Sequence, residues 1–419
     1  MVLLRKWSSV LGRAVIAASA GVGLVQLAVT AKRGDQLGAQ PAERAGGAGD
    51  GVAPNEGPYL SGAVQLTLPG RFVRAGEAYF DHLTPPRNVI FQAEERGAGA
   101  GQYAMYVAPL RYDSRQAVIG LGEPTRLSAP GSANTCGWFF PSDSKRVLFG
   151  STLGPVAPEE RSPGYQRDSG RYRWSFPSAM RIVTATITKD AKADGPVEEL
   201  VDRPGGDGYA AEASWSPDGR FLLYTHVDPA TGDADLWVWD SGHEASFALV
   251  REPGYDGGGF FSPDGQRVCY RSDRRGNGEL QVYVADLAFD PAEPALITGV
   301  RREVAITDDP GVVNWAPFWH PTGSYLVFAS SRAGHTNYEL EAIEVLPQST
   351  PGRRARVTHA AGFDGLPAYS RDGTLLMWTS QRGPKNPDGT ASSQLWVASV
   401  IGDPAWEPAG PRAASPGAR

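Results

Sequence analysis

Six acidic or amide residues stand at repeated places ahead of a turn that recurs along the chain. The turns are marked at positions 141, 217, 263, 321 and 371, and the residue seven positions earlier is Asn or Asp in four of the five copies. A glutamate stands five positions before the mark at 217, and another holds a similar place in an earlier, less regular copy. Carboxylate and amide oxygens suit a hard cation such as calcium, or a polar partner. The predicted ligand- or partner-binding residues, expected to line one mouth of a central channel, are Glu77, Asn134, Glu212, Asp256, Asn314 and Asp364.

A structural interpretation of the same residues stays open. Asn and Asp also begin turns by bonding to nearby backbone groups, and their oxygens can join neighbouring repeats. If a metal site exists, Asp256 and Asp364 are its first candidates, and calcium is the one cofactor that these residue types suggest. The aspartates inside the turns are expected to serve hairpin geometry only; they are Asp218, Asp264 and Asp372.

The elements that must position these residues form an internal repeat. The segments SWSPDGRFLLYTH at 214–226, FFSPDGQRVCYRS at 260–272 and AYSRDGTLLMWTS at 368–380 share an aromatic strand, a tight turn and an apolar strand. Glycine supplies the positive φ that such a turn needs. Further copies lie at 79–93, 139–151 and 318–330, and two more strands follow each turn. Four antiparallel strands repeated six times predict an all-β fold, a six-bladed β-propeller.

The last repeat lacks its fourth strand. After Val400 the chain becomes rich in Pro and Gly, whereas an unassigned strand at 63–68 precedes the first copy. We expect this N-terminal strand to complete the last blade and close the ring, which hides the sheet edges. Insertions at 152–174 in blade two and 383–392 in blade six lengthen two of the repeats.

The residues before the repeats predict export. Basic residues precede an uncharged, weakly apolar run at 14–31 that ends in small residues, as a signal peptidase requires. We therefore predict a signal peptide over 1–31, with an uncleaved membrane anchor as the alternative, and a periplasmic or otherwise extracytoplasmic location reached by the general secretory route. Residues 32–56 are poor in large apolar side chains and predict a flexible linker. The propeller then covers 57–403, and 404–419 is expected to be a disordered tail.

Composition and missing motifs narrow the functional classes. The 419 residues include 40 basic and 46 acidic side chains, so the positive surface of a nucleic-acid-binding protein is not indicated. The metalloprotease, nucleophile-elbow and phosphate-loop motifs are all missing from the sequence. We therefore predict that the protein is not an enzyme and name no catalytic residue. Cys136 and Cys269 fall in strands of different blades and are expected to be free, buried thiols rather than a disulfide.

The insertion in blade two is a second candidate contact surface. It contains aromatic and arginine side chains, which are favoured at interfaces. The loop either contacts a partner or packs over its own blade. Its candidate contact residues are Tyr165, Arg171, Tyr172, Arg173 and Trp174.

The repeat resembles a known family. The pieces NTCGWFFP at 134–141, GYDGGGFFSPDG at 254–265 and GFDGLPAYSRDG at 362–373 resemble exported bacterial TolB-like propellers with WD40-like repeats, over roughly residues 57–403. Two positions depart from the pattern: His226 replaces the last Ser of its copy and Arg371 replaces the turn Pro. The resemblance implies a periplasmic protein that works with cell-envelope partners. TolB itself also carries an N-terminal α/β domain, where this chain shows only the predicted linker.

Two functional hypotheses follow from different classes. The first is an exported, non-enzymatic propeller, monomeric, that binds an envelope protein, a peptide or a glycan at the channel mouth and touches a membrane only through an uncleaved N-terminal segment. The second is a propeller-type polysaccharide lyase or glycosidase. Carboxylates in the channel would then do the chemistry, as the paired carboxylates of glycosidases do.

Overall fold

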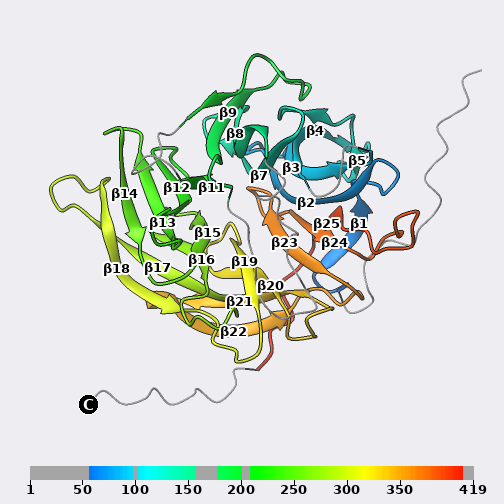
Figure 1. Cartoon of the computed structure of the whole chain (residues 1–419). Helices are drawn as coiled ribbons and strands as arrows, with labels where there is room; N and C mark the ends of the chain where they lie inside the picture. The colour runs from blue at the N-terminus through cyan, green and yellow to red at the C-terminus, as the bar shows by residue number, and fades with distance from the viewer. Residues whose placement is uncertain (1–55, 98–101, 157–176, 201–207, 409–419) are drawn as a thin grey trace, which may run out of the picture. The chain divides into compact units, whose positions relative to one another are not determined.

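The computed structural model describes residues 56–97, 102–156, 177–200 and 208–408. These residues fold into six antiparallel sheets, the blades of a propeller, arranged around a common axis (Figure 1). From the axis outward, the first three blades are β2 (Phe72–Phe80), β3 (Asn88–Glu95), β4 (Ala104–Tyr112) and β5 (Val118–Leu121); β7 (Ser132–Phe140), β8 (Asp143–Pro155), β9 (Arg181–Thr186) and β10 (Glu198–Glu199); and β11 (Tyr209–Trp215), β12 (Phe221–Val227), β13 (Ala234–Asp240) and β14 (Ala245–Val250).

The remaining blades continue in the same order. They are β15 (Asp256–Phe261), β16 (Arg267–Ser272), β17 (Gln281–Phe289) and β18 (Ile297–Ala305); β19 (Asn314–Trp319), β20 (Tyr325–Ser330), β21 (Glu339–Leu346) and β22 (Thr350–Arg356); and β23 (Asp364–Tyr369), β24 (Leu375–Ser380), β25 (Gln394–Val400) and β1 (Leu60–Gln65). In blade one, β6 (Thr125–Arg126) also pairs with β4 and shares the outer position with β5. The helical structure of the described part of the chain is a single 3₁₀ turn, η3 (Pro347–Ser349), and none of it is a helix long and apolar enough to cross a membrane.

The N-terminal strand closes the ring, as predicted. β1 pairs antiparallel with β25, with Val64 opposite Val397 and Gln65 opposite Trp396 (Figure 1). The strand lies three residues earlier than the predicted segment at 63–68, and Leu68 is 54% exposed instead of paired. The innermost strands β2, β7, β11, β15, β19 and β23 contact one another in cyclic order, so the channel is fully encircled.

The recurring turn joins the first and second strands by a fixed set of hydrogen bonds. In blade three, the Ser216 hydroxyl donates to Asp218 at 2.5 Å and accepts from the Phe221 amide at 2.9 Å, while Gly219 has φ +76°. The turns at Ser262 and Ser370 repeat this pattern. The hairpin role predicted for the turn aspartates is confirmed. We call the end of the channel that these turns surround the turn end, and the other end the loop end.

Each innermost strand has a bulge at its middle that aims one residue at the axis. The pairing register between the first and second strands shifts there in all six blades. One residue of each bulge lies in the left-handed region, with φ between 46° and 58°. Glycine is present once among the six, so the backbone of this fold accepts side chains at that φ. The residues are Glu77, Cys136, Glu212, Gly258, Ala316 and Leu366.

The core lies between neighbouring blades. Middle strands such as β12 and β20 are buried along their whole length, because another blade covers each face of the sheet. One apolar cluster joins Val327 and Leu340 of blade five to Leu376 and Trp378 of blade six. A fully buried side chain of this kind contributes about 1.5–3 kcal/mol, so packing between blades holds the ring together.

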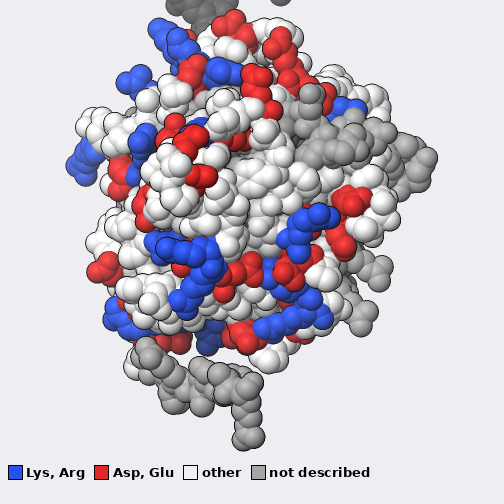
Figure 2. Space-filling model, turned by 90° about the vertical axis from the view of Figure 1, so that its left-hand side faces the viewer, with Lys and Arg blue, Asp and Glu red and all other residues white. Residues whose placement is uncertain are grey.

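One side of the molecule carries charges of both signs. On the side of the molecule that lies at the left of Figure 1, basic and acidic side chains alternate without a large area of one sign (Figure 2). Arg220, for example, pairs with Asp240 and with Glu293, each at 2.9 Å. Asp240 is buried, whereas Glu293 is exposed, and a pair with an exposed partner contributes about 0–1 kcal/mol.

Both ends of the described chain are held more firmly than predicted. Glu56, predicted as the last residue of the flexible linker, is 1% exposed and pairs with Arg382 at 3.0 Å. At the other end, the Trp406 ring lies 5.5 Å from that of Tyr325, and the Glu407 amide donates to the Arg354 carbonyl at 2.8 Å. The predictions of a linker through 56 and of a tail disordered from 404 were therefore wrong at Glu56 and at 404–408. The predicted signal segment lies outside the described residues.

Candidate functional site

Four of the six predicted binding residues lie at the loop end, where the innermost strands begin. Asp256 and Asp364 are at most 1% exposed, and each forms an ion pair with an arginine of its own blade. Asp256 pairs with Arg274 at 2.9 Å, and Asp364 pairs with Arg382 at 2.7 Å. Burial raises the pKa of Asp256 to about 6, although Ser272 and Arg274 act in the opposite direction.

The two asparagines are also engaged within the protein. Asn314 donates its amide to Gln281 and to Asp309, each at 3.0 Å, and accepts from Arg354 at 3.2 Å. Asn134 donates to the Tyr103 carbonyl at 3.0 Å. No hydrogen bond or ion pair among the described residues joins any of these four side chains to another of the four. The arrangement supports their structural interpretation, and a ligand role for them stays a prediction.

A sequence signal for this arrangement exists. In blades four and six the aspartate faces a serine on the second strand, and an arginine follows two residues later. The Ser272 hydroxyl accepts from the Arg274 amide at 3.2 Å, and Ser380 accepts from Arg382 at 3.1 Å. An aspartate followed by serine sixteen residues later and by arginine eighteen residues later could have indicated an internal ion pair. The described residues contain no group of three or more His, Cys, Asp or Glu side chains arranged to hold a metal ion, and the calcium hypothesis stays a prediction.

The other two predicted residues meet on the channel axis. Glu212 accepts hydrogen bonds from Arg271 at 3.0 Å, Tyr255 at 2.6 Å and Thr225 at 2.8 Å. Glu77 accepts one from the Cys136 thiol at 2.9 Å. We call Glu77, Cys136, Glu212 and Arg271 the channel plug. The plug leaves a cavity of only about 10 Å³ on the axis.

Gly258 makes room for the plug. A Cβ atom at this residue would lie 2.1 Å from Nη1 and 2.5 Å from Cζ of Arg271. The guanidinium thus fills the space that a side chain fills in the other five blades. The other five blades have a non-glycine residue at a similar φ. Blade four therefore needs glycine because the Arg271 guanidinium leaves no space for a side chain, and not because of the backbone conformation.

The Cys136 thiol of the plug is not set up to act as a nucleophile. Burial raises the pKa of Glu77, and the Cys136 thiol and Arg271 offset this rise only in part. Burial, together with Glu77, also raises the pKa of the Cys136 thiol well above its usual value. A thiol held protonated is a poor nucleophile. Cys136 and Cys269 are both free and buried, as predicted.

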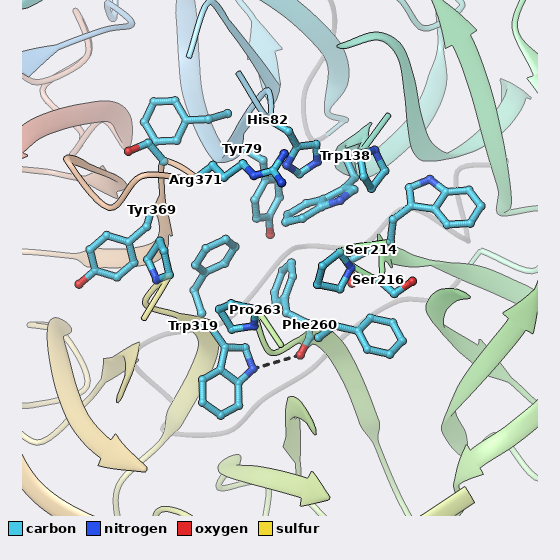
Figure 3. Close-up of a pocket in the computed structure, with 18 of the residues that line it drawn as sticks. Tyr79, His82, Trp138, Ser214, Ser216, Phe260, Pro263, Trp319, Tyr369 and Arg371 are labelled. Carbon is cyan, nitrogen blue, oxygen red and sulfur yellow. Dashed lines mark hydrogen bonds between the residues drawn. The ribbon is translucent and has the colours of Figure 1, made fainter. Parts of the chain in front are cut away.

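An aromatic pocket lies at the turn end, directly against the plug. It has a volume of about 290 Å³. Its floor consists of Tyr79, Trp138, Phe260 and Phe318, whose rings lie 4.9–6.2 Å apart between centroids. Tyr79, Trp138 and Phe260 also line the small cavity at the plug. Figure 3 shows Tyr79, Trp138 and Phe260 pointing toward one another from different blades.

Most polar groups of the pocket are already bonded within the protein. The Asp81 carboxylate accepts from the amides of Leu83, Arg87 and Asn88 and from the Asn88 side chain, at 2.9–3.3 Å. His82 donates Nε2–H to the Phe139 carbonyl at 3.1 Å, and burial lowers its pKa, so the ring is neutral at pH 7. Arg371 differs: it is exposed, and no described residue forms an ion pair or hydrogen bond with its guanidinium.

The sequence analysis missed this pocket. The residue three positions before the turn mark is Trp138, Phe260 or Phe318 in three blades, and this recurrence could have indicated an aromatic cluster near the axis. The binding residues predicted from the sequence were all polar, and most of them lie at the loop end. The predicted contact residues of the blade-two insertion, Tyr165, Arg171, Tyr172, Arg173 and Trp174, lie outside the described residues.

Fold and site together define a six-bladed β-propeller with a plugged channel and an aromatic pocket at one end. The chain is 25% identical over 183 residues to the Tol-Pal system protein TolB of Wolinella succinogenes, a match that covers 44% of this chain and 39% of that protein. The predicted resemblance to TolB-like propellers is confirmed. No protein-family model matches the chain.

Several solved structures have a similar architecture. TolB from Acinetobacter baumannii is 14% identical with a TM-score of 0.46, covering 76% of this chain and 65% of that chain. The periplasmic gluconolactonase of Pseudomonas aeruginosa is 16% identical with a TM-score of 0.45, covering 78% and 86%. Oligogalacturonate lyase from Vibrio parahaemolyticus is 10% identical with a TM-score of 0.44, covering 82% and 93%. Likeness of this degree says nothing about activity.

Proposed function

We propose that this protein is an exported, non-enzymatic binding propeller that holds a segment of an envelope protein in the aromatic pocket at the turn end. The observation that carries the proposal is the pocket itself: aromatic rings from four blades, of which Tyr79 is buried and the other three are partly exposed, line about 290 Å³ at the axis. Concave aromatic sites with few polar groups are typical of binding pockets. The sequence predicted binding residues around one mouth of the channel, and four of those six residues lie at the loop end. The ion-paired and buried side chains found there favour the turn end instead.

The cellular setting rests on two further observations. The name of the relative from Wolinella succinogenes places that protein in the Tol-Pal system. The basic and then uncharged residues at the start of this chain favour export. An extracytoplasmic protein with an envelope partner agrees with both. The blade-two insertion remains a predicted second contact.

A pull-down from the cell envelope tests the pocket. Phe318→Ala reproduces the residue that blade six has at the same place, Ala368, and is therefore expected to fold. Truncating a central aromatic contact costs about 2 kcal/mol or more, which corresponds to roughly a 30-fold loss of affinity. Phe247→Ala on the outer strand β14 is the matched control and should retain binding. Full capture of the same partner by Phe318→Ala would reject the pocket as the binding site.

A carbohydrate-active enzyme is the second candidate, because Glu77 and Glu212 lie together in the channel in contrasting surroundings. Burial raises the pKa of Glu77, whereas Glu212 is ion-paired with Arg271 at 3.0 Å. Contrasting carboxylates are a feature of acid–base pairs. The cavity of about 10 Å³ beside them holds at most one water molecule, which favours the binding function. Turnover of a polysaccharide that Glu212→Gln abolishes, with the fold intact, would favour the enzyme.

A further inference from the structure

At the rim of the aromatic pocket, blade six departs from the turn residue that four other blades share. Four blades place a turn proline at the rim: Pro141, Pro217, Pro263 and Pro321. Blade six places Arg371 there instead. Figure 3 shows the Arg371 side chain extended across the pocket toward His82. A cation thus stands where four of the other blades have a turn proline, while blade one contributes Asp81 and His82.

No carboxylate of the described residues forms an ion pair with Arg371. The Asp81 carboxylate at the same rim is occupied by four donors. The hydroxyls of Ser216 and Ser370 donate to the turn aspartates Asp218 and Asp372. His82 is neutral because its ring is buried and its Nε2–H donates to a carbonyl. The pocket therefore has an apolar floor and, at its edge, the Arg371 guanidinium, with which no described residue forms a hydrogen bond or ion pair.

We propose that the pocket recognises the C-terminal carboxylate of a polypeptide whose last side chain is apolar, with the carboxylate on Arg371 and the side chain on the aromatic floor. Resting on the proposed function, this inference names the chemistry of the segment that the pocket holds. A guanidinium binds a carboxylate by paired, charge-assisted hydrogen bonds. The volume of about 290 Å³ is at the lower limit of ligand pockets, which suits a chain end better than a continuing chain.

The variant that tests this idea restores the pattern of the repeat. Arg371→Pro gives blade six the SPDG turn of blades three and four. Proline suits this turn position, and no hydrogen bond of the Arg371 amide is lost among the described residues. The variant is therefore expected to fold while losing the cation. Arg111→Gln, an exposed arginine on β4 that does not line the pocket, is the matched control.

The probes are two short peptides, acetyl-Gly-Ser-Gly-Phe with a free C-terminus and the same peptide with a C-terminal amide, titrated by calorimetry. We expect the acid to bind the wild-type protein and Arg111→Gln about tenfold or more tightly than the amide. In Arg371→Pro the two affinities should become equal. Equal affinities in the wild-type protein would overturn the carboxylate assignment while supporting the pocket. If neither peptide binds, the assignment is also overturned, and the Phe318→Ala pull-down then decides separately whether the pocket binds a partner.

Discussion

Replacing Gly258 by alanine tests whether the channel plug is held by a buried ion pair. The added methyl group would lie 2.1 Å from Nη1 of Arg271, so the guanidinium must leave Glu212. Their side chains are 4% and 3% exposed, and Glu212 would remain as a buried, unpaired charge. Breaking a buried pair in this way costs about 3–5 kcal/mol. An alanine in the left-handed region adds about 1–2 kcal/mol, so the expected loss of stability is about 4–7 kcal/mol.

Gly276→Ala is the matched control. Gly276 has φ +68°, and nothing lies within 4 Å of a Cβ atom built there. Its substitution should therefore lower the free energy of unfolding only by the cost of an alanine in the left-handed region, about 1–2 kcal/mol. Urea unfolding followed by tryptophan fluorescence measures both losses. In an Arg271→Met background, Gly258→Ala should cost no more than Gly276→Ala. Equal losses for the two glycines in the wild-type background would refute the reasoning.

Three further predictions concern the ends of the ring, pH and calcium. Glu56→Gln should destabilise the protein by about 1–3 kcal/mol, because Arg382 loses one of its two buried carboxylate partners and keeps Asp364 at 2.7 Å; an unchanged urea midpoint would contradict this. Burial and the nearby Asp364 raise the pKa of Glu339 to about 7 from 4.5, so the folded state holds a proton that the unfolded chain releases. Stability should then fall by up to about 1.4 kcal/mol per pH unit as the pH rises from 4.5 to 7; Glu339→Gln should flatten this slope, and an unaltered slope would count against it. Calcium should leave Tm unchanged because Arg274 and Arg382 already neutralise Asp256 and Asp364; a rise in Tm that Asp364→Asn abolishes would instead support the calcium site.

The architecture could be predicted from the sequence because its signals are local and repeated. A turn such as Ser216 to Gly219 needs only its own hydrogen bonds and a positive φ, and six copies leave few alternatives to a propeller. The closing strand could be predicted because blade six lacked a partner for Gln394–Val400. Its bounds were displaced because strand ends depend on neighbours far along the chain, such as the Leu66 amide bonded to the Leu395 carbonyl at 2.8 Å.

The site was harder to predict because the same residue types serve two purposes. Asp256 looks like a ligand in the sequence, but its partner Arg274 lies eighteen residues away and satisfies its charge. The aromatic floor combines Tyr79, Trp138, Phe260 and Phe318 from four blades. Only the ring geometry brings these residues together. Arg371 was recognised as a departure from the repeat, yet its importance depends on the prolines that surround it in space.

The pairing of β1 with β25 affects when the ring can close during folding. The Leu395 amide donates to the hydroxyl of Thr67, 328 positions earlier in the chain, so blade six forms only after nearly the whole polypeptide has been synthesised. Pairings of such long range form slowly. The ring therefore stays open until synthesis is nearly complete, a delay that agrees with the export proposed for this protein.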